Sequence, residues 1–153
     1  MKNEIDFKKL ESHKDEIMIR KYKDMKDSYK NKLLTGNPII YKVYIKDYDD
    51  FEEGLTVIEP GTIGKEYYMT KGHRHVKNNP EIYVLIEGKG KLIIQNKTTK
   101  TYELKKEKIY HIPGRSGHRL VNTGEKPLKV MTIYSKDAGH DYKFKFKKSI
   151  LKK

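Results

Sequence analysis

Short runs of β-branched and aromatic residues dominate the chain beyond Asn37-Pro38, and glycine, proline or asparagine occupies most of the gaps between them. Eight runs have this character: residues 39–45, 55–58, 67–70, 82–86, 91–95, 109–112, 119–121 and 129–134. About eight short strands separated by turns are typical of a sandwich, a jelly roll or a barrel. The pattern therefore predicts an all-β fold.

The two ends of the chain have different patterns. From Met1 to about Lys32 the sequence is charged, with apolar residues at irregular helix-like intervals, which predicts a short helical or extended lead-in. Residues 143–153 are rich in lysine and begin with alternating lysine and phenylalanine, so we expect an edge strand or a loose tail there. A length of 153 residues suits one domain, here 1–153 with a core of about 38–142.

Composition narrows the classes of function. The chain has no cysteine, which excludes disulfides and thiolate metal sites, and no apolar stretch suited to a signal peptide or a membrane span, so we expect a cytoplasmic protein without a membrane partner. A net charge of +13 favours anionic partners. However, only four of the 34 basic residues are arginines, and the 12 tyrosines are scattered along the chain. Nucleic-acid binding is therefore the least favoured function, and the simplest interpretation of the charge is a solvated lysine surface.

One cluster of residues suggests a metal site. His73 and His75 would share one face of a strand, whereas on a helix they would diverge by about 200°. After a short turn, Glu81 begins the next run, which we expect to lie antiparallel to the first. His118 follows roughly forty residues later. Unrelated histidines and a salt-bridging glutamate would explain His-x-His alone. Three imidazoles and one carboxylate in strand context instead suit Fe²⁺, Mn²⁺, Ni²⁺ or Zn²⁺, with positions left open for a substrate.

Hydroxyl groups near this cluster could hold a ligand. Tyr83 alternates with Glu81 and should face the same interior, either as core packing or as a hydroxyl donor. Thr56, Thr70 and Gly72 could hold a phosphate. Simple alternation along a strand, however, would place Thr70 on the face opposite to that of His73 and His75. Either Gly72 marks a bulge, or Thr70 is an ordinary strand residue, which the residues alone favour.

A separate histidine lies near the end of the chain. His140 stands beside Asp141, so it could shuttle protons or simply be solvated.

Two motifs resemble those of the cupin superfamily. The first is His-x-His with Glu81, six residues and Gly88; the second is Pro113, His118 and Asn122 at matching spacing. More narrowly, several segments resemble the cupin-type glucose-6-phosphate isomerases, best known from archaea: residues 60–61, 66–73, 81–84, 88–90, 118–122 and 134–142. The resemblance covers roughly residues 17–142. It implies a jelly-roll β-barrel or sandwich.

The resemblance also implies roles for individual residues. His73, His75, Glu81 and His118 would hold one divalent metal ion per subunit, often Fe²⁺ in that family. The family's phosphate-binding positions fall on Tyr41, Thr56, Thr70, Gly72 and Tyr83. Tyr134 and His140 would line the sugar end. Such enzymes are typically homodimers. Two departures concern the turn before Glu81, which is one residue shorter than in the family, and Asn79, which replaces an expected tyrosine.

These roles predict interconversion of glucose 6-phosphate and fructose 6-phosphate. Glu81 would be the base, and His140 and Tyr134 would assist ring opening or relay protons. Proton transfer through an enediolate and a hydride shift between C1 and C2 both stay open. The alternative function is a non-catalytic or differently specific metal-binding protein for a sugar phosphate.

Overall fold

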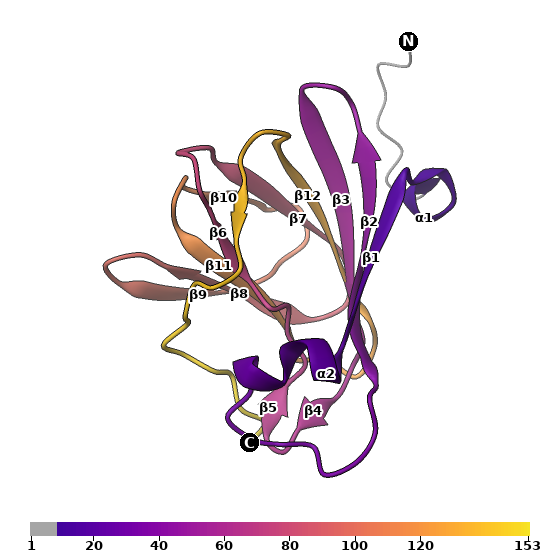
Figure 1. The fold of residues 1–153 in the computed structure, drawn as a ribbon, viewed down its shortest axis with the longest axis vertical. Helices are drawn as coiled ribbons and strands as arrows, with labels where there is room; N and C mark the ends of the chain where they lie inside the picture. Colours follow the sequence, from indigo (N-terminus) through magenta and orange to yellow (C-terminus); the bar gives the residue numbers. More distant parts are fainter. Residues whose placement is uncertain (1–8) are drawn as a thin grey trace.

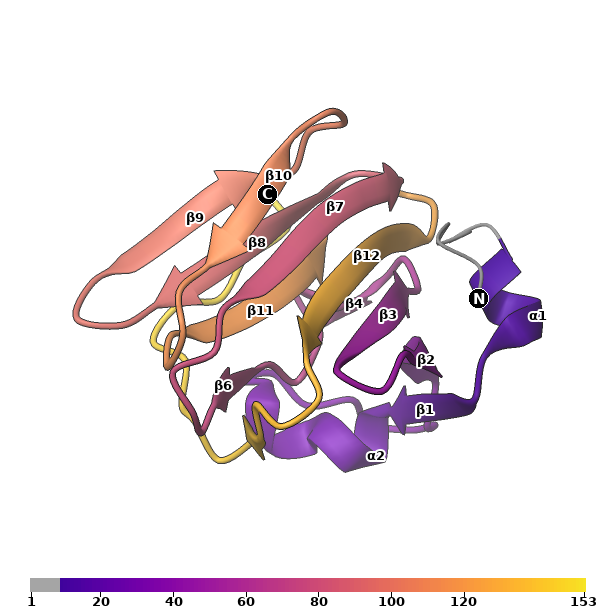
Figure 2. The same ribbon diagram turned by 90° about the horizontal axis from the view of Figure 1, so that it is seen from above.

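The computed structural model describes residues 9–153 and consists mainly of two antiparallel sheets that face each other (Figures 1 and 2). The six-stranded sheet has the order β1 (Glu16–Lys21), β2 (Ile39–Asp47), β3 (Phe51–Ile58), β12 (Leu128–Ser135), β7 (Glu81–Glu87) and β10 (Ile109–Ile112). The five-stranded sheet has the order β13 (His140–Asp141), β6 (His73–His75), β11 (Gly117–Asn122), β8 (Gly90–Gln95) and β9 (Thr99–Glu103). A small ribbon pairs β4 (Thr62–Ile63) with β5 (Glu66–Tyr67).

Apolar residues of both sheets form one core. Ile58 and Val130 of the first sheet and Leu92 and Leu120 of the second are at most 1% exposed. Burial on one face of each sheet is what the alternating pattern predicts, and the all-β jelly-roll prediction is confirmed.

Most of the predicted runs are strands, but residues 67–70 are not. β5 ends at Tyr67, and Met69 makes only an isolated bridge to Val121 of β11. Among the described residues, four strands were not predicted: β1, β9 and the two-residue strands β4 and β13. β1 and β9 are rich in charged or polar residues and lie at sheet edges, where pairing with one neighbour imposes the extended conformation.

The lead-in combines both predicted conformations within its described part; its first eight residues lie outside the described chain. Two single-turn helices flank β1: α1 (Leu10–His13) and α2 (Tyr22–Met25), the latter continued by the 3₁₀ turn η2 (Lys26–Ser28). The Asp24 carboxylate accepts a hydrogen bond from Lys21 N–H and thereby caps the N-terminus of α2. Met25 is then buried in the core, so the lead-in packs against the barrel.

The lysine-rich segment is not a loose tail, and it pairs like an edge strand only at its end, where Leu151 forms an isolated antiparallel bridge with Glu66 of β5. Residues 143–151, which we call the C-terminal strap, cross the outer face of the five-stranded sheet. Gln95 binds the strap backbone through both polar atoms of its side-chain amide. Its Nε2 donates to Lys145 O at 3.1 Å, and its Oε1 accepts from Lys147 N–H at 2.8 Å. Phe144 and Phe146 face the sheet, while the intervening lysines are exposed.

Asn122 links the two sheets at the end of β11. Its side chain is fully buried and donates to Ile58 O and Lys126 O, both at 2.9 Å. This buried amide explains the asparagine of the second motif as a structural residue. Among the described residues, no helix has the length and apolar character needed to cross a membrane.

Candidate metal centre and adjoining pocket

Four potential metal ligands converge between the sheets. His73 and His75 begin and end β6 and therefore point to the same side. His118 is directly paired with His73 in the neighbouring strand β11, and Glu81 is the first residue of β7. One ligand atom from each residue lies within 4.8 Å of all the others. The structure thus brings together all four residues that the sequence predicted.

The expected pairing of the histidine strand with the glutamate strand is wrong. β6 pairs with β11 and β13, whereas β7 pairs with β10 and β12 in the opposite sheet. The turn of residues 76–80 carries the chain from one sheet to the other, so Glu81 meets the imidazoles across the interior. A hairpin turn and a crossing turn of five residues look alike in sequence, because both place polar and proline residues between two runs.

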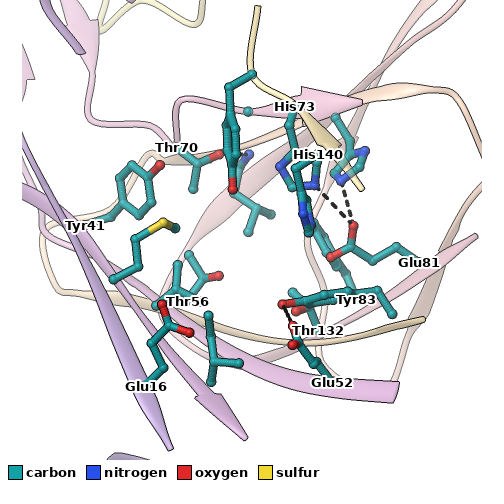
Figure 3. A pocket seen from close by; sticks show the side chains of 18 residues that line it. Glu16, Tyr41, Glu52, Thr56, Thr70, His73, Glu81, Tyr83, Thr132 and His140 are labelled. Carbon is teal, nitrogen blue, oxygen red and sulfur yellow. Dashed lines mark hydrogen bonds and ion pairs between the residues drawn. The ribbon is translucent and has the colours of Figure 1, made fainter. Parts of the chain in front are cut away.

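Glu81 Oε2 approaches all three imidazoles, and Figure 3 marks its ion pairs with the cavity-lining histidines by dashed lines. Its distances to the Nε2 atoms are 2.7 Å for His118, 3.2 Å for His75 and 3.8 Å for His73. These ion-pair distances are short, yet none of the four buried atoms has a hydrogen bond of acceptable geometry. Such an arrangement suits a shared cation better than a set of hydrogen bonds.

Backbone carbonyls fix the tautomers of two ligands. His75 Nδ1 lies 2.9 Å from Asn79 O, and His118 Nδ1 lies 3.0 Å from Ser116 O. A carbonyl only accepts, so each Nδ1 carries hydrogen and the neutral ring presents its Nε2 lone pair to the cluster. Asn79, which departs from the family pattern, thus orients a ligand through its backbone.

Burial and charge favour the ligand forms of His73 and Glu81, but not of His75: burial alone would lower the pKa of His75, whereas the Glu81 carboxylate raises it above its usual value. Burial lowers the pKa of His73 well below its usual value, which keeps the ring neutral. Burial alone would raise the pKa of Glu81, but the imidazoles, with His118 first, hold it far below its usual value. A neutral imidazole and an ionised carboxylate are the forms that bind a divalent ion. The donor set, its four atoms without hydrogen bonds and its fixed tautomers therefore fit a metal.

The cluster forms one end of a cavity of about 240 Å³ between the sheets. Ten predicted site residues line it: Tyr41, Thr56, Thr70, Gly72, His73, Glu81, Tyr83, His118, Tyr134 and His140. His75 alone of the predicted set lies behind this surface, with 2% exposure. Figure 3 shows Tyr41, Thr56 and Thr70 at the end opposite Glu81 and His140.

Gly72 explains how Thr70 and His73 come to line the same cavity. It has φ of +73°, a left-handed conformation that favours glycine, and the backbone changes direction there. The chain before Gly72 is not a regular strand, so the alternation that placed Thr70 on the opposite face does not apply. The irregular alternative, and not the ordinary strand residue, is therefore correct.

The hydroxyl groups at this end have protons available for a ligand. Thr70 Oγ1 accepts from Leu120 N–H at 3.0 Å, and the Tyr41 hydroxyl accepts from Lys71 N–H at 3.3 Å. Burial raises the pKa of Tyr41 to about 12, so its proton is retained. Each oxygen already accepts from the backbone, which leaves its own O–H to donate into the cavity.

Tyr134 and His140 lie at the metal end. The His140 ring centre is 4.5 Å from that of His73 and 5.4 Å from that of Tyr134. Burial lowers the pKa of His140, which favours the neutral ring. The Tyr134 hydroxyl donates to Glu52 Oε2 at 2.6 Å.

Sequence reasoning missed several lining residues. They are Glu16, Met18, Val43, Ile45, Glu52, Leu120, Thr132 and Tyr142. The predicted run of residues 55–58 began too late; starting it at Phe51, as β3 does, would have placed Glu52 on the face of Thr56 by simple alternation. Glu16 could not be found this way, because nothing in the sequence shows that β1 pairs with β2.

Comparisons with known proteins place the chain among sugar-phosphate isomerases. The family model "Glucose-6-phosphate isomerase (GPI)" matches residues 17–150. The glucose-6-phosphate isomerase of Thermococcus litoralis is 35% identical over 137 residues, 81% of this chain and 72% of that protein. The enzyme of Thermococcus onnurineus is 36% identical over 138 residues, with coverage of 82% and 72%.

Solved structures support the fold. A Bacillus subtilis oxalate decarboxylase variant has a TM-score of 0.54 and 26% identity over 65% of this chain. The Lactobacillus farciminis oxalate decarboxylase has a TM-score of 0.55 at 22% identity, over 76% of this chain. This chain spans only 26% and 33% of those two proteins, so the likeness concerns the jelly roll. The Bacillus subtilis oxalate decarboxylase contains Mn(II) centres.

Proposed function

The chain belongs to the glucose-6-phosphate isomerase family, and we propose that it interconverts glucose 6-phosphate and fructose 6-phosphate with a divalent metal ion in the cavity between its sheets. One observation carries the proposal: the same cavity has a set of metal ligands at one end and a set of hydroxyl donors at the other. A hexose 6-phosphate has groups that suit both ends: reactive oxygens at C1 and C2 for the metal end, and a phosphate at C6 for the hydroxyl donors.

His73, His75, Glu81 and His118 would hold the metal. When bound, the ion supplies electrophilic stabilisation of negative charge at the sugar oxygens. We propose one ion per subunit, with Fe²⁺ first and Mn²⁺, Ni²⁺ or Zn²⁺ as alternatives, because the donor types suit all four.

The other end would bind the phosphate. Tyr41, Thr56 and Thr70 offer hydroxyl donors at this end, and Gly72 brings its backbone close to the ligand. Tyr83, the fourth hydroxyl proposed for the phosphate, lies beside Glu81 and His118 and would donate from the metal side. Burial raises the pKa of Tyr83 well above its usual value, so that hydroxyl also keeps its proton. Donors of this kind fix the sugar in one orientation, with C1 and C2 towards the histidines.

Proton transfers would fall to the residues around Glu81. The reaction moves a hydrogen between C1 and C2, and Glu81 is the ionised carboxylate in the cavity that would accept a proton from carbon. Its lowered pKa makes it a weak base while it contacts the imidazoles, so it would have to detach from them to act as the base. His140 is neutral and close to the cluster, so it can accept or donate a proton at the sugar oxygens during ring opening. Tyr134, held by Glu52, would support that transfer.

The decisive experiment measures isomerisation and metal dependence together. The purified protein, treated with chelator and then loaded with each of the four ions, should interconvert the two hexose phosphates only when loaded. His118→Ala should abolish activity, whereas His111→Ala, an exposed histidine on β10, should not. A folded, metal-loaded protein that binds the sugar phosphate without interconverting it would favour the non-catalytic alternative.

The proposal includes a single domain in a cytoplasmic homodimer. Sedimentation at micromolar concentration tests the assembly directly, because a monomer of 18.1 kDa and its dimer are readily distinguished.

A further inference from the structure

The cavity lacks a positive charge where the proposed function places a phosphate. The chain has 34 lysines and arginines, yet none is among the described residues that line this cavity. Three glutamates, Glu16, Glu52 and Glu81, do line it. Neutral donors alone would have to bind a dianion in a partly buried site, which is unfavourable without a nearby cation.

Arg119 lies directly behind the phosphate end. It follows His118 on β11, so its side chain points to the outer face of the five-stranded sheet, where it is only 5% exposed. Its Nε donates to Thr70 O at 3.0 Å and its Nη2 to Lys71 O at 2.7 Å. The guanidinium therefore binds two consecutive carbonyls of the segment that contains Thr70 and Gly72.

The Thr70–Lys71 and Lys71–Gly72 peptide groups transmit this interaction to the cavity side. In a planar trans peptide the N–H points away from the C=O, so carbonyls turned towards Arg119 direct the next two N–H groups to the opposite side. The first of these, Lys71 N–H, donates to the Tyr41 hydroxyl, which lines the cavity. The second is the N–H of Gly72, for which the described residues supply no acceptor. Polarised peptides of this kind are stronger donors to an anion.

Arg119 has no acidic partner in direct contact among the described residues, although the charge of the buried Glu66 carboxylate acts on it from farther away. It forms no ion pair with a carboxylate in the part of the chain that the structure describes. Phe146 of the strap covers its guanidinium at 4.1 Å from the ring centre. A second cavity of about 390 Å³ on this outer side is lined by Lys30, Lys71, Lys143, Lys145 and a single acid, Asp27. Burial lowers the pKa of Arg119 to about 10, so the charge persists at neutral pH.

We infer that Arg119 is a positioning residue for the substrate phosphate: without touching it, the buried guanidinium aligns and polarises the Lys71 and Gly72 amides that present donors to the anion. The inference rests on the proposed function, because it assumes that the anion binds at this end. It assigns the missing positive charge to one residue, and Gly72 N–H to direct contact with the phosphate.

The test separates the charge of Arg119 from its hydrogen bonds. Arg119→Gln can still donate to one carbonyl but has no charge, whereas Arg119→Lys keeps the charge. Calorimetric titration with sorbitol 6-phosphate, which has the phosphate but no carbonyl, should show binding at least about tenfold weaker for Arg119→Gln and within about threefold of wild type for Arg119→Lys. Turnover at saturation should fall much less than KM rises.

Two controls test whether this charge is specific. Arg115→Gln removes the same charge from an exposed loop and should change affinity by less than about twofold. Arg20 pairs with Tyr41 between β1 and β2 but is half-buried and donates only to Ile19 O. Arg20→Gln should weaken binding by less than about threefold, because solvent screens that charge. Equal losses for Arg20→Gln and Arg119→Gln would overturn the assignment, as would a folded Arg119→Gln protein with wild-type affinity.

A second measurement needs no substitution. In zinc-loaded wild-type protein, which is diamagnetic, sorbitol 6-phosphate should shift the Gly72 amide proton strongly downfield in ¹H–¹⁵N spectra. A Gly72 amide that does not respond, while Thr70 does, would overturn the inference and leave the proposed function intact. A wild-type protein that binds neither sorbitol 6-phosphate nor inorganic phosphate would instead contradict the proposed function.

Discussion

Gly72 is the residue where the phosphate end, the metal end and the strap meet. A Cβ on this residue would lie 2.6 Å from the Phe146 ring and 2.9 Å from His118 O. Its φ of +73° adds backbone strain for any other residue. No other residue type satisfies both the conformation and the close approach, so this glycine is required by the geometry of the cavity.

We expect Gly72→Ala to destabilise the protein by at least about 3 kcal/mol, because strain and steric overlap add. Gly36→Ala is the matched control. Gly36 also has a positive φ, of +89°, but its Cβ would meet nothing closer than 4.0 Å, so a loss of about 1 kcal/mol is expected. Urea unfolding measures both. Similar losses for the two variants would show that the Phe146 and His118 contacts do not constrain Gly72.

Tyr134 and Glu52 should act as one unit. Their 2.6 Å hydrogen bond orients the phenol, and Tyr134→Phe leaves a carboxylate without its donor, at a cost of about 1–3 kcal/mol in stability. Both Tyr134→Phe and Glu52→Gln should lower kcat with little change in metal affinity. The double variant should be little worse than the poorer single variant, as a double-mutant cycle on kcat would show. If the two losses in kcat multiplied in the double variant, the two side chains would act independently.

Residue-level prediction from sequence succeeded where spacing alone decides direction. The i, i+2 spacing of His73 and His75 required a strand, and the structure has that strand with both side chains in the candidate metal cluster. Arg119 could not be recognised in this way. Alternation after His118 places it outside the barrel, but the carbonyls it binds belong to a segment about fifty residues earlier in the chain.

At the scale of elements, the metal cluster depends on two sheets that the sequence could not assign. The pattern indicated most strands correctly, yet β6 and β7 belong to different sheets. Strand pairing depends on contacts between distant residues, and local alternation has no information about them. The strap was likewise ambiguous, because its alternation of lysine and phenylalanine is equally suited to an edge strand or to an extended segment lying on a sheet.

Gln95 should hold the strap in place. Gln95→Ala removes both hydrogen bonds to the strap backbone, at a cost of about 1–3 kcal/mol in the free energy of local opening. Trypsin should therefore cleave the lysine-rich strap several-fold faster than in wild type, as mass spectrometry can follow. Thr101→Ala is the control, since it removes only the exposed bond from Lys148 Nζ. Equal cleavage in the two variants would mean that the phenylalanines alone hold the strap.

At the scale of the whole molecule, charge is distributed unevenly. The whole chain has a net charge of +13, whereas the described residues that line the cavity include three glutamates and no lysine or arginine. A basic surface attracts an anionic sugar phosphate from solution, and an acidic lining attracts the metal cation. The strong net charge first suggested nucleic acid as one possible partner, but this separation of charges suits a small anion and a divalent ion bound in one cavity.

Metal binding should stabilise the whole fold, because the four ligands come together only in the folded chain. At a free concentration one hundred times the Kd, the gain is about 2.7 kcal/mol, which for a domain of this size raises Tm by roughly 5–10 °C. Differential scanning calorimetry with Mn²⁺ should show this rise, and chelator should reverse it. His118→Ala should lose the rise while His111→Ala retains it. A rise of equal size in His118→Ala would place the bound ion elsewhere, because a cluster without one of its three imidazoles cannot bind the metal with unchanged affinity.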